Sequence, residues 1–207
     1  YKRQGQLPYN FQKASILTYV IYLIARPVTQ LYSTPEKSPI TSWAYSILGQ
    51  IYVVLPLALL GVWGYKSDYQ LFMNTEYLLM ALFVFVWTND TGAYIVGCTL
   101  GKHRLFERIS PKKSWEGFFG GLAFCIILAS LANHIIPGML STAQWIGMGI
   151  LTSIFSTWGD LCESLLKRTA GVKDSGKILP GHGGILDRFD SELIASPVIF
   201  IYLTFVL

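Results

Sequence analysis

The chain has 207 residues, of which 52% are hydrophobic and only 14% are charged, and its mean hydropathy is +0.44. Because soluble domains usually carry about a quarter charged residues, this composition excludes an ordinary water-soluble globule. The formal net charge of +4 is modest, and we expect no nucleic-acid partner. A transmembrane helix takes roughly 20 apolar residues, so we expect an all-α, polytopic integral membrane protein with about six such helices in the lipid bilayer. We expect residues 1–207 to form one transmembrane domain.

The first part of the chain predicts two apolar segments. Residues 1–13 are polar, and an apolar segment follows at about 14–33, interrupted by Arg26-Pro27. After the proline-rich loop 33–39, an uncharged run predicts a second span near 40–64. Because the chain starts with a tyrosine and stops inside an apolar run, we expect it to be a fragment truncated at its N-terminus.

The third predicted span, near 77–100, carries a charge in its middle. It contains the sequence WTNDTGAY with Asp90, and a carboxylate near mid-membrane costs on the order of 2.5–3.5 kcal/mol on insertion scales. Such a group normally faces a partner or a wet cavity. Asp90 is therefore either a structural hydrogen-bonding residue or part of a functional site.

The second half of the chain predicts a basic loop and further spans. The loop Gly101–Lys113 carries five Lys or Arg residues against one Glu. The uncharged run between Glu116 and Asp160 is too long for one helix, and we expect the segment His134–Thr142 to divide it into two spans. A last apolar segment begins near Leu193.

The distribution of Lys and Arg predicts the orientation in the membrane. If the two spans around 134–142 form a hairpin, the basic loop 101–113 and the polar stretch 160–190 lie on the same side. The connecting loop has no Lys or Arg, as expected of the outer side, so both charged segments are predicted to face the cytoplasm. The basic residues within 1–13 then fall outside if segment 14–33 spans, and this conflict stays open.

The glycine spacings Gly97/Gly101 and Gly117/Gly121 match the GxxxG pattern that lets helices approach closely in lipid. Chance matches are also common in a chain with 19 glycines. Both interpretations remain open at this stage.

The stretch 160–190, DLCESLLKRTAGVKDSGKILPGHGGILDRFD, combines charges of both signs between apolar flanks. Asp160 and Glu163 are spaced i, i+3, and Asp187 and Asp190 repeat that spacing. Each pair is consistent with an exposed helix end. Together, the pairs would supply the oxygen ligands that suit Mg²⁺ and phosphates. The Gly183-Gly184 turn before a helix start can aim backbone N–H groups at an anion.

Cationic side chains concentrate in the two segments predicted to be cytoplasmic. Each gains roughly 1 kcal/mol near an anionic leaflet, and some are also candidates to hold a phosphate substrate. They are Lys112, Lys113, Lys167, Arg168, Lys173, Lys177 and Arg188.

The motif running from Ser164-Leu165-Leu166-Lys167-Arg168 through Lys173-Asp174 to Leu179-Pro180-Gly181-His182-Gly183-Gly184-Ile185-Leu186-Asp187-Arg188-Phe189-Asp190 resembles the signature of phosphatidate cytidylyltransferases. The resemblance extends to WTNDTGAY at 87–94, SPKKSWEG at 110–117 and GDLCES at 159–164, and so covers roughly residues 40–207.

This resemblance implies a multi-pass enzyme of the bacterial inner membrane whose active site faces the cytoplasm. It implies a homodimer that converts CTP and phosphatidic acid into CDP-diacylglycerol and pyrophosphate, with Mg²⁺ and a second, monovalent cation (K⁺). By resemblance, the metal-binding carboxylates are Asp160, Asp187 and Asp190, with Asp90 as a neighbour. Further catalytic candidates are Lys173 and His182. Substrate-binding candidates are Lys113, Ser114, Lys167, Arg168, Gly183, Gly184 and Arg188.

Two alternatives to this function remain. One is the same chemistry on another lipid phosphate, because apolar grooves tolerate different tails. The other is an ion-coupled membrane transporter that uses Asp90 as its intramembrane carboxylate. Against the transporter, the charge is concentrated in one stretch and the sequence has no internal repeat.

Overall fold

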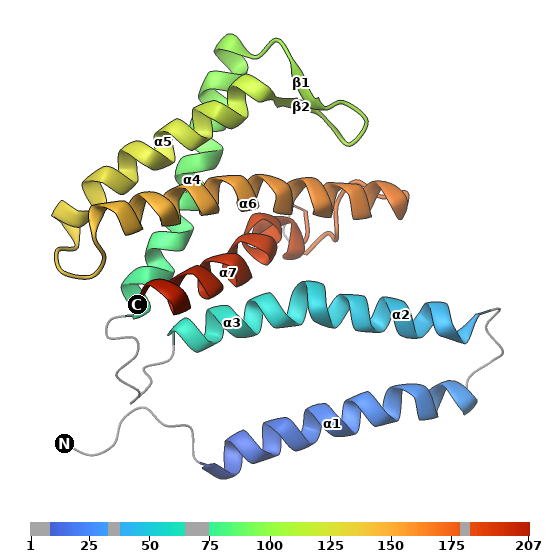
Figure 1. Ribbon diagram of the computed structural model, residues 1–207. Helices are drawn as coiled ribbons and strands as arrows, with labels where there is room; N and C mark the ends of the chain where they lie inside the picture. Colours follow the sequence, from blue (N-terminus) through green and yellow to red (C-terminus); the bar gives the residue numbers. More distant parts are fainter. Residues whose placement is uncertain (1–8, 33–37, 65–74, 179–182) are drawn as a thin grey trace. The chain divides into compact units, whose positions relative to one another are not determined.

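The computed structural model describes residues 9–32, 38–64, 75–178 and 183–207, and Figure 1 shows its elements. The chain divides into two compact units, Tyr1–Thr75 and Glu76–Leu207. Each unit is described by itself. The expectation of one domain over residues 1–207 stays a prediction.

In the first unit, an arginine joins two helices. Helix α1 (Tyr9–Tyr32) continues through Arg26-Pro27, so the expected interruption does not end it. The guanidinium of Arg26 donates hydrogen bonds to the Oγ atoms of Ser42 at 2.8 Å and Ser46 at 3.2 Å, both on α2 (Pro39–Gly49). A charge among apolar side chains is tolerated here because its donors are satisfied across the helix pair.

The predicted second span, near 40–64, is a single long helix with a local widening. Helix α2 passes into the π-helical turn η1 (Gln50–Val54) and then into α3 (Leu55–Gly64). The backbone N–H of Leu55 donates to the carbonyl of Gln50, one residue further back than in an α-helix. Because Pro56 has no N–H and its ring crowds the preceding turn, the wider turn relieves the helix at this point.

The described residues of the second unit form four helices and a two-stranded ribbon. Helix α4 (Thr75–Leu100) leads into the antiparallel strands β1 (Arg104–Phe106) and β2 (Ser110–Ser114). Helices α5 (Trp115–Ile135) and α6 (Thr142–Thr169) form a hairpin, and α7 (Leu186–Val206) lies alongside α6 (Figure 1). The predicted division of the long uncharged run at 134–142 is confirmed.

Four of the described helical segments are long and apolar enough to cross a membrane: Pro39–Gly61, Glu76–Leu100, Trp115–Ile135 and Leu186–Val206. The expected all-α, multi-pass membrane architecture is therefore confirmed, whereas the expected count of six spans stays a prediction.

Two boundaries differ from the sequence expectation. The basic loop Gly101–Lys113 contains most of the β1–β2 ribbon, and all other elements in the described ranges are helices. Helix α7 begins at Leu186 rather than near Leu193. Its first turn is polar because it belongs to the charged stretch, and hydropathy alone therefore places the helix start too late.

The glycines of the predicted GxxxG pairs allow α4 and α5 to pack closely. A Cβ atom added to Gly117 would lie 2.8 Å from the carbonyl oxygen of Ala93 and 3.3 Å from the Cα of Gly97. A Cβ added to Gly121 would lie 2.5 Å from the Oδ1 atom of Asn89. A side chain does not fit at these distances, so the packing interpretation is confirmed for Gly117 and Gly121.

Candidate functional site

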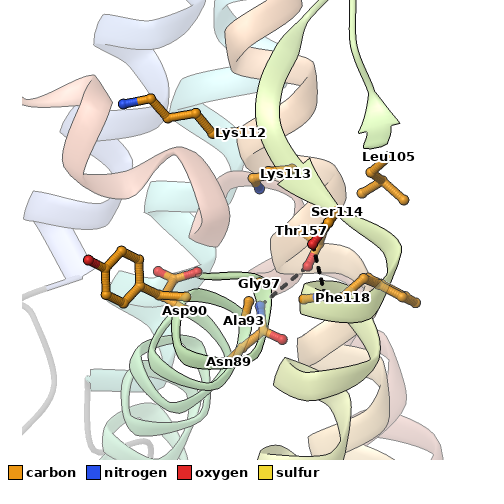
Figure 2. Close-up of a pocket in the computed structure, with 12 residues that line it drawn as sticks. Asn89, Asp90, Ala93, Gly97, Leu105, Lys112, Lys113, Ser114, Phe118 and Thr157 are labelled. Carbon is orange, nitrogen blue, oxygen red and sulfur yellow. Dashed lines mark hydrogen bonds between the residues drawn. The ribbon is translucent and has the colours of Figure 1, made fainter. Parts of the chain in front are cut away.

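A pocket of about 210 Å³ lies where α4, the β1–β2 ribbon, α5 and α6 meet. Figure 2 shows Asp90, Asn89, Ala93 and Gly97 along α4, with Ser114 and Phe118 facing them from the start of α5. Two lysines of β2, Lys112 and Lys113, complete its polar wall. The pocket is smaller than the roughly 300–1,000 Å³ of typical small-molecule sites, which suits one phosphate group better than a whole nucleotide.

One lysine of this pocket joins the ribbon to α6. The Nζ atom of Lys113 lies 2.6 Å from the Oδ2 atom of Asp160, and both side chains are about a third exposed or less. A partly shielded pair of opposite charges attracts more strongly than one in bulk water. The pair brings the two segments that the sequence predicted to share the cytoplasmic side, 101–113 and 160–190, into direct contact.

The base of the ribbon is held by Glu116, in the first turn of α5. Its carboxylate accepts hydrogen bonds from the backbone N–H groups of Lys102 at 3.1 Å and His103 at 3.2 Å. The Nδ1 atom of His103 lies 2.6 Å from the same carboxylate. These contacts fix the start of β1 beside the first turn of α5, and β1 in turn pairs with β2, which carries Lys113.

Ser114 is buried at the junction of β2 and α5. Its Oγ atom accepts a hydrogen bond from the N–H of Gly117 and so caps the N-terminus of α5. The sequence predicted a substrate contact for Ser114. It does line the pocket, but its hydroxyl oxygen already has this structural partner.

Beside the pocket, a buried amide links α4 to α6. Asn89, which is 1% exposed, accepts a hydrogen bond from the hydroxyl of Ser153 at 2.6 Å and donates to Ser156 at 3.1 Å and Thr157 at 3.3 Å. All three hydroxyls lie on one face of α6, at spacing i, i+3, i+4. This network fixes the position of α4 along the axis of α6. It therefore also fixes the position of Asp90 relative to Asp160.

A second polar centre lies where the end of α6 meets the start of α7. The Nζ atom of Lys167 forms ion pairs with Glu163, one turn earlier, and with Asp187, whose Oδ1 atom lies 2.8 Å away. The Glu163 side chain is 1% exposed, and this burial raises the pKa of its carboxyl group to about 7, against the lowering effect of Lys167. One ammonium group is thus shared by two carboxyl groups in a shielded site.

The glycine turn before α7 binds an anion, and that anion is the chain's own Asp187. Gly183 has a φ of +82°, which favours glycine. The N–H of Gly184 donates to Asp187 Oδ2 at 2.7 Å, and Ser175 donates to the same oxygen from its N–H and its hydroxyl, each at 2.9 Å. In this structure Asp187 therefore anchors the connection between α6 and α7.

The remaining predicted site residues are more dispersed. Asp190 is half-buried, and its Oδ1 atom accepts from the N–H of Ser191 at 2.7 Å. Arg168 and Lys173 are exposed, and Arg168 donates to the carbonyl of Val172 at 3.3 Å. His182 lies outside the described residues.

Comparison with known proteins matches residues 2–206 of this chain to the model of the cytidylyltransferase family. The chain belongs to the cytidylyltransferase family. This match and the polar pocket between apolar helices agree with the resemblance found in the signature motif.

Relatives within this family are similar over most of the chain. The phosphatidate cytidylyltransferase of Staphylococcus aureus (strain COL) is 41% identical over 160 residues, which cover 77% of this chain and 61% of that protein. Those of Staphylococcus haemolyticus (strain JCSC1435) and Staphylococcus epidermidis (strain ATCC 12228 / FDA PCI 1200) are 41% and 40% identical over 159 residues, with the same coverage. The match thus spans about 61% of the length of these curated relatives.

In this chain, the predicted site residues form two groups. In the first group, Asp90 and Lys113 line the pocket, and Lys113 forms an ion pair with Asp160. In the second group, Lys167 forms ion pairs with both Glu163 and Asp187. Within the described ranges, no three His, Cys, Asp or Glu side chains form a ready group for a metal ion. The metal assignment of Asp90, Asp160, Asp187 and Asp190 therefore stays a prediction.

Sequence reasoning did not single out Glu116 or Asn89 as site residues. Asn89 lies next to Asp90 in the WTNDTGAY segment, and its partners on α6 follow helical spacing, so a signal was present. Glu116 lies within the SPKKSWEG segment, but its contact with His103 depends on the ribbon, which the sequence did not predict.

Proposed function

We propose that this chain carries the catalytic region of an enzyme that transfers a cytidylyl group from CTP to phosphatidic acid. The products are CDP-diacylglycerol and pyrophosphate. The observation that carries this proposal is the pocket lined by Asp90 and by Lys113, which pairs with Asp160, beside two helices that are long and apolar enough to span a membrane. Membership of the cytidylyltransferase family and the names of the relatives support it.

The reaction requires two polyanions to meet. An oxygen of the lipid phosphate attacks the α-phosphorus of CTP, a new P–O bond forms, and the bond from the α-phosphorus to the oxygen bridging to the β-phosphate breaks, releasing pyrophosphate. Because a phosphate monoester is already anionic at neutral pH, the attack needs no strong general base. The demand on the protein is to offset charge repulsion and align the reacting groups.

The lysines of both polar centres meet this demand. Lys112 and Lys113 line the pocket, where they bind one phosphate group. Lys167 lies between two carboxylates, so moving it toward a substrate phosphate requires another positive charge to replace it. Asp160 and Asp187 thus each stabilise a cation in this arrangement, and their oxygen donors suit Mg²⁺.

We propose that Asp160 and Asp190, with Asp90 nearby, hold Mg²⁺ and a monovalent cation such as K⁺, and that Asp187 contributes once Lys167 leaves it. When bound, such ions neutralise phosphate charge and orient the reacting oxygens. This chain's own residues position the ions, and Lys113 and Lys167 then become available to the substrates.

The two substrates differ in solubility, because CTP is water-soluble and phosphatidic acid is embedded in lipid. A site that serves both belongs at the headgroup level. We infer a site that faces the cytoplasm of a bacterial inner membrane, and a homodimeric assembly, as the resemblance implies. The basic ribbon carrying Lys112 and Lys113 supports that orientation, since Lys and Arg favour the cytoplasmic side.

Incorporation of radioactivity from [α-³²P]CTP into lipid tests the function. The purified protein in phosphatidylcholine nanodiscs is supplied with phosphatidic acid, with and without Mg²⁺, and diacylglycerol replaces phosphatidic acid in the control. We expect a labelled CDP-lipid only with phosphatidic acid and Mg²⁺. Absence of any CTP-dependent lipid product would refute the proposal, and equal labelling with a different lipid phosphate would redirect it to that substrate.

A further inference from the structure

A second cavity, of about 550 Å³, lies between α4 and α7 and shares no lining residue with the pocket of Figure 2. Its α4 wall is apolar and follows the spacing i, i+3, i+4, i+7 of one helix face, with Met80, Phe83, Val84 and Trp87. Helix α7 contributes Arg188, Phe189 and Glu192. The volume is within the roughly 300–1,000 Å³ of known ligand sites.

Glu192 distinguishes this cavity from an ordinary gap between helices. Its side chain is 3% exposed, and within the described part of the chain its Oε2 atom has no hydrogen-bond partner. Acidic groups within membrane-spanning helices normally pair with a neighbour or mark a ligand path. Glu192 lies on one candidate span and faces a cavity against another. A ligand in the cavity is the partner that this carboxyl group lacks.

The cavity is open along the apolar surface of α4. Met80 is 62% exposed and Trp87 is 65% exposed, although both line the cavity. Arg188 lies one helical turn before Glu192 on α7, so the two polar groups share one face. The lining therefore offers a cation, then a carboxyl group, and an apolar wall beside both. This order is complementary to an amphiphile with an anionic head, a polar linkage and a hydrocarbon tail.

We propose that this cavity binds the lipid substrate, an anionic glycerophospholipid, through one acyl chain and its ester linkage. The acyl chain lies against Phe83, Val84 and Trp87, the ester linkage lies beside the buried polar side chain of Glu192, and the phosphate is nearest Arg188. The proposal deepens the proposed function and rests on it, because it assigns the lipid half of the reaction to a surface separate from the pocket at Asp90.

Photolabelling tests this assignment without depending on turnover. Phosphatidic acid with a diazirine in one acyl chain is added, without CTP, to the protein in phosphatidylcholine nanodiscs, and the labelled peptides are mapped by mass spectrometry. Val84→Trp and, separately, Met80→Trp fill the cavity. Ile127→Trp is the matched control, because Ile127 is an exposed apolar residue of α5 outside the cavity.

We expect α4 and α7 peptides to be labelled in the wild type and in Ile127→Trp, and labelling to fall at least fivefold in both cavity-filling variants. Glu192→Gln keeps a polar side chain of the same size and should retain labelling, whereas Glu192→Leu should lose most of it. In turnover assays, Val84→Trp should raise the KM for phosphatidic acid severalfold and leave the KM for CTP unchanged.

Two results would overturn the assignment: labelling of α4 that Val84→Trp and Met80→Trp leave unchanged, or equal labelling by a diazirine-bearing diacylglycerol, which lacks the anionic head. Size-exclusion profiles of the variants verify folding. A wild-type protein that is labelled in the cavity but consumes no CTP would contradict the proposed function alone. A protein that turns over CTP but is not labelled there would contradict the lipid site alone.

Discussion

The Nζ atom of Lys113 on β2 lies 2.6 Å from the Oδ2 atom of Asp160 on α6. The two residues are far apart in the sequence, and each belongs to a charged segment between apolar helices. Lys113 also lines the pocket that contains Asp90. A cation next to a carboxylate, each about a third exposed or less, can exchange partners when a phosphate and a metal ion arrive.

Replacing Lys113 should lower the reaction with CTP more than it lowers the stability of the fold. We expect Lys113→Gln to reduce kcat/KM for CTP by at least tenfold, because a phosphate in the pocket loses a charge-assisted contact worth roughly 1.5–3 kcal/mol. The midpoint of thermal unfolding should change little, since partly exposed ion pairs stabilise weakly. Arg108→Gln is the control, because Arg108 is an exposed cation near the ribbon and does not line the pocket. Equal losses in both variants would indicate a general charge effect instead.

The amide of Asn89 should matter for stability. Asn89→Ala leaves the hydroxyls of Ser153, Ser156 and Thr157 without their cross-helix partner. We expect a loss of about 1–2 kcal/mol, in the upper part of the range for hydrogen bonds between membrane helices. Thermal unfolding in detergent measures it. Thr88→Ala is the matched control, because the Thr88 hydroxyl bonds only to the carbonyl of Val84 in its own helix; an equal loss there would contradict the network.

A methyl group at Gly121 should force α4 and α5 apart. The added Cβ would lie 2.5 Å from the Oδ1 atom and 2.7 Å from the carbonyl oxygen of Asn89. We expect Gly121→Ala to destabilise the protein by about 1–3 kcal/mol, as overpacking does, and to lower activity by displacing Asp90. Gly61→Ala, where an added Cβ meets nothing within 4 Å, should be neutral. Unchanged unfolding of Gly121→Ala would show that the helices do not pack this way.

Asp187 has an anchoring role in the structure and a metal-binding role in the proposal, and one variant separates them. Asp187→Asn keeps the size but loses the charge that holds Lys167 and the N–H groups of Ser175 and Gly184. We expect a membrane-inserted protein with very little Mg²⁺-dependent transfer. Faster amide hydrogen exchange in residues 170–178 would report loss of the anchor.

The comparison for this variant is Ser175→Ala, which removes one hydroxyl contact to Asp187 and leaves the carboxylate. If Ser175→Ala loosens the same segment but retains transfer, the loss in Asp187→Asn reflects chemistry rather than anchoring. Near-normal transfer by Asp187→Asn would remove this residue from the metal proposal.

The sequence predicted the helical parts of this fold because hydropathy is a property of each segment alone. The spans near 77–100 and 40–64 and the turn at 134–142 agree with α4, with α2 to α3, and with the α5–α6 connection. The ribbon at Arg104–Ser114 was missed because its strands have three and five residues and lack clear alternation. Its conformation depends on the contacts of Glu116 with Lys102 and His103.

The sequence predicted which residues belong to the candidate site, but it did not predict which of them form ion pairs with each other. The signature motif identified Lys167 and Asp187 as important, and the GDLCES segment identified Asp160, but spacing along the chain does not determine which lysine meets which carboxylate. Lys113 reaches Asp160 because the ribbon folds back over α6, and Lys167 reaches Asp187 because α7 starts at Leu186. Both contacts are tertiary and follow from elements whose boundaries the sequence left imprecise.

The central claim is that Lys113 and Asp160 act together on the phosphates of CTP and a lipid phosphate. A double-mutant cycle of kcat/KM for transfer from [α-³²P]CTP to phosphatidic acid, using Lys113→Gln, Asp160→Asn and the double variant, tests it most directly. We predict that each single variant loses most of the activity and that the double variant loses far less than the product of the two effects, because the residues act as a unit. Independent effects, with the losses multiplying, or near-normal transfer by Asp160→Asn, would contradict it.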